Sequence, residues 1–60
     1  MALTSKELSF LEDQLAFEQL MVKKYQAAEN MATDESVRVK MRNAAERHQQ
    51  HFAKLMSHLN

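Results

Sequence analysis

The sequence predicts an all-α protein: an antiparallel two-helix hairpin that pairs as a homodimer into a four-helix bundle. Three observations predict it. The chain has no Gly, Pro or Cys, and good helix formers dominate its composition. Apolar residues recur in steps of three and four along most of the chain. This pattern fades once, at residues 30–34, so residues 1–60 are expected to form a single helical hairpin.

The first helix is expected to cover about residues 5–31. Thr4 and Glu7 form a capping-box pattern, in which each side chain accepts a hydrogen bond from the backbone amide of the other residue. The main stripe of the helix consists of Leu8, Leu11, Leu15, Glu18, Val22 and Tyr25. A second apolar edge, about a quarter turn away, consists of Phe10, Phe17, Met21 and Ala28. The combined face is wider than one neighbouring helix covers, which favours a bundle.

The second helix is expected to cover about residues 35–59. Thr33 or Asp34 is placed to cap its first turn, where Glu35 suits the helix dipole. One stripe of this helix consists of Val37, Met41, Ala44, His48, Phe52, Leu55 and Leu59. Since a chain this short buries little surface alone, pairing with a second copy is the expected remedy.

The charge pattern argues against a nucleic-acid or membrane partner. Eight basic residues balance eight acidic ones, so no net field attracts either. The basic residues Arg38, Lys40, Arg42 and Arg47 do not share one face and have no exposed aromatic partner, so we interpret them as a solvated surface. The start of the chain lacks the pattern of a signal peptide, and no stretch has transmembrane length. We therefore expect a cytoplasmic protein or one built into a structure inside the cell.

Two polar residues lie on the apolar stripes at the same height. If the hairpin folds about Thr33, Glu18 lies fifteen residues before the turn and His48 fifteen after it. Two interpretations remain open. Glu18 and His48 form a buried hydrogen bond that sets the register of the helices, or they bind Fe, Mn or Zn. His51, three residues after His48, is a third candidate ligand at the edge of this layer.

The segments around these residues resemble the ferritin-like, rubrerythrin-type bundle. In that family a metal-binding Glu precedes a Tyr by seven residues, as Glu18 precedes Tyr25. A Glu-x-x-His motif with an aromatic residue four positions later is typical of the second helix, and His48 and Phe52 match it. Ala45 stands where the motif has its Glu. The bridging carboxylate of a di-iron site is therefore missing, which favours a non-catalytic protein over an enzyme.

A closer resemblance, over nearly the whole chain, is to short spore coat F-like proteins, which are half-ferritin hairpins. Glu18-Gln19 and Lys24-Tyr25 match in the first helix, and His48-Gln49-Gln50-His51 matches in the second. The resemblance implies a ferritin-like homodimer with a structural role, a place in the spore coat or cytoplasm, and other coat proteins as partners. The alternative is a metal-binding protein or oxidoreductase that uses Glu18 and His48 of both protomers.

Overall fold

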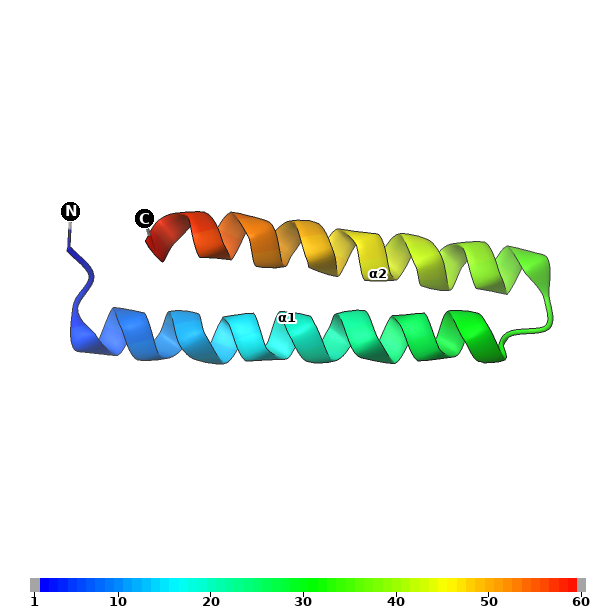
Figure 1. The fold of residues 1–60 in the computed structure, drawn as a ribbon, viewed down its shortest axis with the longest axis horizontal. Helices are drawn as coiled ribbons and strands as arrows, with labels where there is room; N and C mark the ends of the chain where they lie inside the picture. The colour runs from blue at the N-terminus through cyan, green and yellow to red at the C-terminus, as the bar shows by residue number, and fades with distance from the viewer. Residues whose placement is uncertain (1, 60) are drawn as a thin grey trace.

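The chain forms a rod of two long helices joined by a short turn (Figure 1). A computed structural model describes residues 2–59, in which helix α1 spans Ser5–Met31 and helix α2 spans Glu35–Met56. The helices run antiparallel, so the beginning of α1 and the end of α2 lie at one end of the rod. The Cα trace measures 46 × 14 × 10 Å. The prediction of an all-α hairpin is confirmed for the described residues.

The start of α1 is set by the capping box that the sequence predicts. The Glu7 amide donates to Thr4 Oγ1 at 3.1 Å, and the Thr4 amide donates to Glu7 Oε1 at 2.9 Å. These two bonds satisfy amides that have no partner within the helix. Hydrogen bonding to Thr4, first through its backbone amide and then through its side chain, holds the pKa of the Glu7 carboxyl below its ordinary value.

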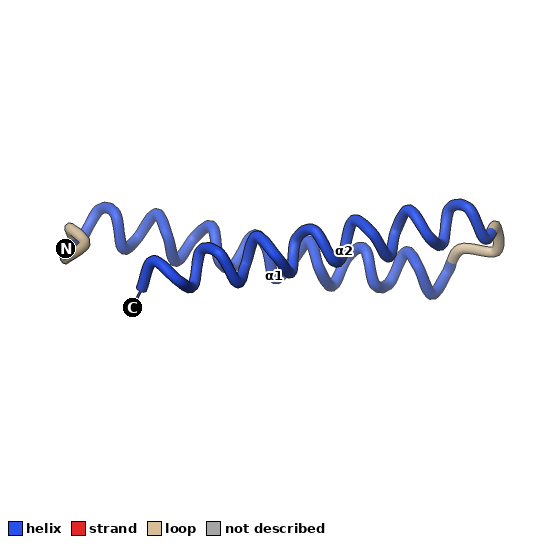
Figure 2. Tube along the Cα trace, turned by 90° about the horizontal axis from the view of Figure 1, so that it is seen from above, coloured by secondary structure: helices blue, strands red, loops and turns tan. Residues whose placement is uncertain are grey.

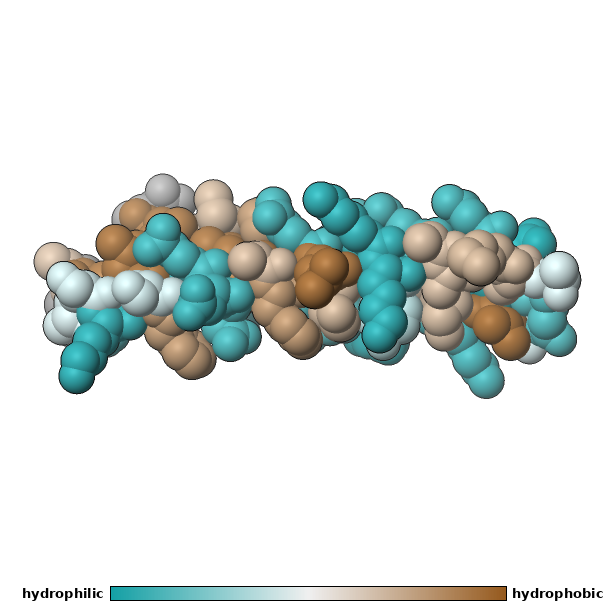
Figure 3. Space-filling model, turned by 90° about the horizontal axis from the view of Figure 1, so that it is seen from below, coloured by the Kyte–Doolittle hydropathy of each residue, from teal (hydrophilic) through white to brown (hydrophobic). Residues whose placement is uncertain are grey.

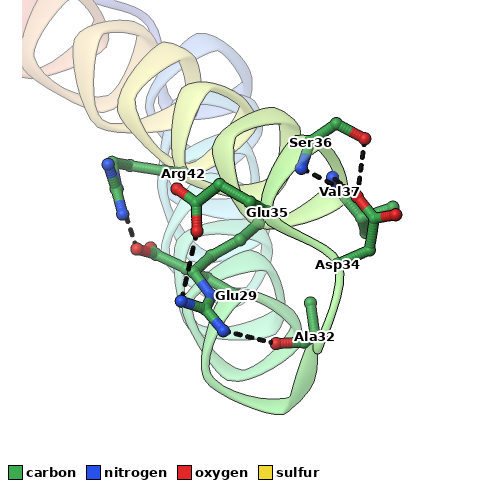
Figure 4. Close-up of polar contacts among 8 residues, drawn as sticks. Glu29, Ala32, Asp34, Glu35, Ser36, Val37 and Arg42 are labelled. Carbon is green, nitrogen blue, oxygen red and sulfur yellow. Dashed lines mark hydrogen bonds and ion pairs between the residues drawn. The ribbon is translucent and has the colours of Figure 1, made fainter.

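Asp34 starts α2 by capping its first turn (Figure 4). The backbone leaves α1 in an extended conformation at Ala32, whose amide still donates to the Ala28 carbonyl. Asp34 Oδ1 then accepts from the Ser36 amide at 2.8 Å and from the Val37 amide at 3.2 Å. It also accepts from the Ser36 hydroxyl at 2.6 Å, which is the main reason that the pKa of Asp34 lies below its ordinary value.

Two arginines tie the turn to both helices, although the sequence analysis interpreted them as part of a solvated surface. The Arg38 guanidinium donates to the Ala32 carbonyl at 3.0 Å and to Glu35 Oε2 at 3.2 Å. Arg42 Nε donates to Glu29 Oε2 of α1 at 2.8 Å (Figure 4). This bond to the Glu29 carboxylate raises the pKa of Arg42. The turn is thus closed by one bond to a backbone carbonyl and one ion pair between the helices.

Helix α2 ends at Met56, before the predicted limit at residue 59. The next residues form a 3₁₀ turn, η1 (Ser57–Leu59), and the Ser57 hydroxyl donates to the Lys54 carbonyl at 2.5 Å. The carbonyls of a last helical turn have no partners further along the helix, and a 3₁₀ turn or a side-chain donor satisfies them. No glycine or proline marks this end in the sequence.

The packing between the helices leaves much apolar surface in solvent. Figure 2 shows that α1 and α2 cross at a shallow angle near the middle of the rod. Among residues 2–59, the buried side chains are Leu11, Glu18, Ala44 and Ala45. Leu15, Val22 and Phe52 are half-buried, as a two-helix contact allows. Phe10 and Phe17, from the second apolar edge of α1, remain exposed.

Candidate functional site

Glu18 and His48 meet in the middle of the hairpin, as their equal distance from the turn predicts. Glu18 comes from α1 and is buried, and His48 comes from α2 and is half-buried. The Nδ1 atom of His48 forms a hydrogen bond with Oε1 of Glu18. Because carboxylate oxygens accept hydrogen bonds, we assign the proton of this contact to Nδ1 of His48. The bond gives both polar groups a partner between the helices, where an unpaired group would be costly.

His51 lies beside this pair, one helical turn after His48. Its Nδ1 atom is 3.7 Å from Glu18 Oε1, and its side chain is 57% exposed. One ligand atom from each of Glu18, His48 and His51 lies within 4.8 Å of the other two. The structure therefore brings together all three residues that the sequence analysis selected. Glu18 and His51 adjoin an open groove of about 250 Å³. Its lining consists of Gln14, Glu18, His51, Lys54, Leu55 and His58.

Aromatic rings hold the His48 imidazole in place. The Tyr25 ring stacks on it, with centroids 5.6 Å apart and planes 9° from parallel. Phe17 meets it edge-on, with centroids 6.4 Å apart and planes at 78°. His51 also meets it edge-on, at 5.6 Å and 86°. With neighbours on several sides, the imidazole keeps Nδ1 directed at Glu18.

The stacking of Tyr25 on His48 is a feature that the sequence analysis missed. Folding the chain about Thr33 leaves Tyr25 seven residues, or about 10 Å, away from the level of Glu18. Helical side chains, however, tilt toward the N-terminus of their own helix. In an antiparallel pair, Tyr25 and His48 therefore lean toward each other and bridge this distance. The direction of the Cα–Cβ bonds in each helix would have predicted the contact between Tyr25 and His48.

The cluster of Glu18, His48 and His51 can act in two ways. The hydrogen bond between Glu18 and His48 can set the register of the two helices, or the three side chains can bind a metal ion. One carboxylate and two imidazoles are donors that Zn, Fe and Mn accept. A metal bound at Nδ1 of His48 would have to replace the proton of the hydrogen bond to Glu18. Ala45 is buried in the helix contact and supplies no ligand, while the adjacent Glu46 is exposed. Within residues 2–59, the converging group thus holds one carboxylate, which fits a single ion and not a carboxylate-bridged pair.

Comparison with known proteins leaves the family open. The chain matches no protein-family profile, no curated protein and no solved structure. The ferritin-like and spore coat F-like resemblance therefore stays a prediction from the short motifs around Glu18 and His48. Across residues 2–59, no helix combines the length and the apolar character that crossing a bilayer requires.

Proposed function

We propose that this chain is a non-catalytic structural protein of the spore coat F-like type. It assembles as a homodimer into a ferritin-like four-helix bundle and contacts other coat proteins. The observation that carries the proposal is the apolar surface of α1 that the hairpin leaves in solvent, above all Phe10, Phe17 and Leu20. Aligned apolar side chains on an otherwise polar helix are typical of an interaction site.

The total surface area supports a second copy as the partner. The accessible surface is 4838 Å² for a chain of 7.0 kDa. A compact monomer of this mass exposes about 4,000 Å². The excess, about 800 Å², equals what one partner buries in a standard interface. Pairing of two hairpins would therefore bring the surface to the value of an ordinary folded protein.

The contact between Glu18 and His48 fits this role as a register device. A polar pair in an apolar layer is satisfied only when the two helices are aligned, so it disfavours shifted arrangements. In a symmetric dimer each hairpin contributes one such pair at mid-height. We expect the two pairs to lie in one central layer of the bundle.

The mass of the protein in solution tests this function. Light scattering across a concentration series should give twice the 7.0 kDa of one chain. The dimer should form without added metal, because its interface is apolar. A monomer at all concentrations up to about 1 mM, where even the weakest specific pairing becomes visible, contradicts the proposal.

Metal binding is a second candidate function, favoured by the convergence of Glu18, His48 and His51 within 4.8 Å. These side chains would hold one Fe, Mn or Zn ion, which would supply Lewis acidity or, for iron and manganese, redox chemistry. The buried Glu18 and the aromatic neighbours of His48 would orient two of the ligands. The exposed His51 lies on the side open to solvent, where an ion could enter.

Metal analysis of the purified protein separates the two functions. Stoichiometric Fe, Mn or Zn that disappears in both Glu18→Ala and His48→Ala would overturn the purely structural role. Metal-free protein whose melting temperature is unchanged by added Fe, Mn or Zn would overturn the metal-binding role. His58→Ala is the matched control, since His58 adjoins the same groove but lies outside the ligand group.

A further inference from the structure

A side of α1 that α2 leaves in solvent carries its own heptad pattern. Figure 3 views this side and shows brown and tan side chains interrupted by teal ones. Phe10 is 66% exposed, Phe17 48% and Leu20 60%. These residues belong to a stripe in steps of three and four, here called the outer stripe. It consists of Phe10, Asp13, Phe17, Leu20, Lys24, Ala27 and Met31. Its spacing is that of a coiled-coil seam.

The outer stripe is complementary to itself when two copies run antiparallel. A two-fold axis midway between Phe17 and Leu20 places each of them opposite the other residue in the partner. The same axis places Asp13 opposite Lys24, since both are equally far from the midpoint. A parallel, in-register pair would instead bring Asp13 against Asp13 and Lys24 against Lys24, which is repulsive.

We propose that a second copy of this chain docks on the outer stripe of α1 in antiparallel orientation, with Asp13 of each copy against Lys24 of the partner subunit. This inference rests on the proposed homodimer and specifies its face, its orientation and its register. The two-fold axis passes at the level of Glu18, so it brings the Glu18 and His48 pairs of both copies to the same height.

The charged residues of the outer stripe are available for this contact. Asp13 and Lys24 are both exposed, and none of the ion pairs within residues 2–59 uses either of them. They flank Phe17 and Leu20 on either side, so the apolar centre would be bounded by two symmetric ion pairs. Such peripheral charges contribute orientation and specificity more than affinity. They therefore make the register testable without disturbing the apolar centre.

Charge reversal tests the register through a mixing experiment. Asp13→Lys alone creates two Lys–Lys contacts in the homodimer, and Lys24→Asp alone creates two Asp–Asp contacts. We expect the dimer Kd of each variant to rise roughly tenfold or more at low salt. An equimolar mixture of the two variants restores both attractive pairs, and its heterodimer should form with the Kd of the unmodified protein. Sedimentation equilibrium measures all of these constants.

Matched controls change the same charges on another side of α1. Glu12→Lys and Lys23→Asp are one residue away from the tested positions, or about 100° around the helix, and point away from the outer stripe. Both should leave the dimer Kd within about twofold, since their charges remain in solvent. Circular dichroism of every variant should show unchanged helix content, because all four positions are exposed.

The possible results separate this inference from the proposed function. A monomeric unmodified protein overturns both. If the protein is a dimer whose Kd is unchanged by the Asp13 and Lys24 reversals, docking on the outer stripe in this register is wrong, and the proposed homodimer still stands. Two weakened variants that fail to recover on mixing overturn the antiparallel pairing. Recovery on mixing, with unaffected controls, supports the register.

Discussion

The contact between Glu18 and His48 should appear as a coupling energy between the two residues. The perturbation is a double-mutant cycle made of Glu18→Leu, His48→Leu and the double variant. Leucine is apolar and of comparable size, so each single variant removes the hydrogen bond without leaving a large cavity. The double variant leaves no unpaired polar group in the layer, and we expect it to be near neutral or more stable than the parent.

The burial of the two side chains sets the magnitude. A hydrogen bond to a charged group contributes about 1.5–3 kcal/mol to stability. The Glu18 side chain is 10% exposed, but that of His48 is 22% exposed, so water competes at the imidazole. We therefore expect the lower end, a coupling of about 1.5 kcal/mol per protomer. The same cycle with His51, 3.7 Å from Glu18 and 57% exposed, should give less than about 0.5 kcal/mol.

Urea unfolding followed by far-ultraviolet circular dichroism measures these energies. All variants are compared at one protomer concentration, because the stability of the proposed dimer would depend on that concentration. Equal slopes of the free energy of unfolding against urea show that the variants expose the same surface on unfolding. A coupling between Glu18 and His48 below about 0.5 kcal/mol, or one no larger than that of the His51 cycle, would contradict a stabilising hydrogen bond between the two side chains.

Three further predictions concern the helix contact, the cap and the turn. Ala45→Glu should lower the free energy of unfolding in metal-free buffer by more than about 2 kcal/mol, because position 45 is only 4% exposed; unchanged urea unfolding would contradict this. Hydrogen bonds lower the pKa of Asp34, so its stabilising effect is full above the ordinary value of 3.8 and is lost as the pH falls through the lower folded value. Acid titration by circular dichroism should show this loss, and Asp34→Asn should reduce it. Arg42→Gln removes the ion pair with Glu29 and should lower the melting temperature slightly at low salt and hardly at all in 1 M NaCl; a salt-independent fall would implicate packing instead.

Local interactions made the helix starts predictable from sequence. The capping box of Thr4 and Glu7 spans four residues, and Asp34 caps α2 through amides two and three residues ahead. Neither depends on the rest of the fold. The end of α2 was missed because the sequence there has no stop signal, and residue spacing does not reveal the 3₁₀ turn or the bond from the Ser57 hydroxyl to the Lys54 carbonyl.

Contacts between the helices were predictable from sequence only for residues at equal distances from the turn. Equal distances from Thr33 placed Glu18 against His48. The stacking of Tyr25 on His48 needed the tilt of side chains along each helix. The ion pair of Arg42 was missed because Arg42 was compared with basic residues of its own helix and not with Glu29 on the facing one. Residue spacing predicts which side chains share a face of one helix, whereas contacts between helices also depend on how the two helices are placed against each other.

Phe17 connects the candidate site to the proposed interface. Its ring meets the His48 imidazole edge-on at 6.4 Å, yet nearly half of the residue is exposed at the centre of the outer stripe. Docking of a second copy would cover Phe17 and exclude water from the side of His48 that it shields. Because hydrogen bonds strengthen as water is excluded, the coupling between Glu18 and His48 should be larger in the dimer than in the monomer. Dimer formation would then strengthen the hydrogen bond that aligns α1 with α2, and this alignment would in turn stabilise the dimer. Such mutual stabilisation is expected of a cluster with a structural role.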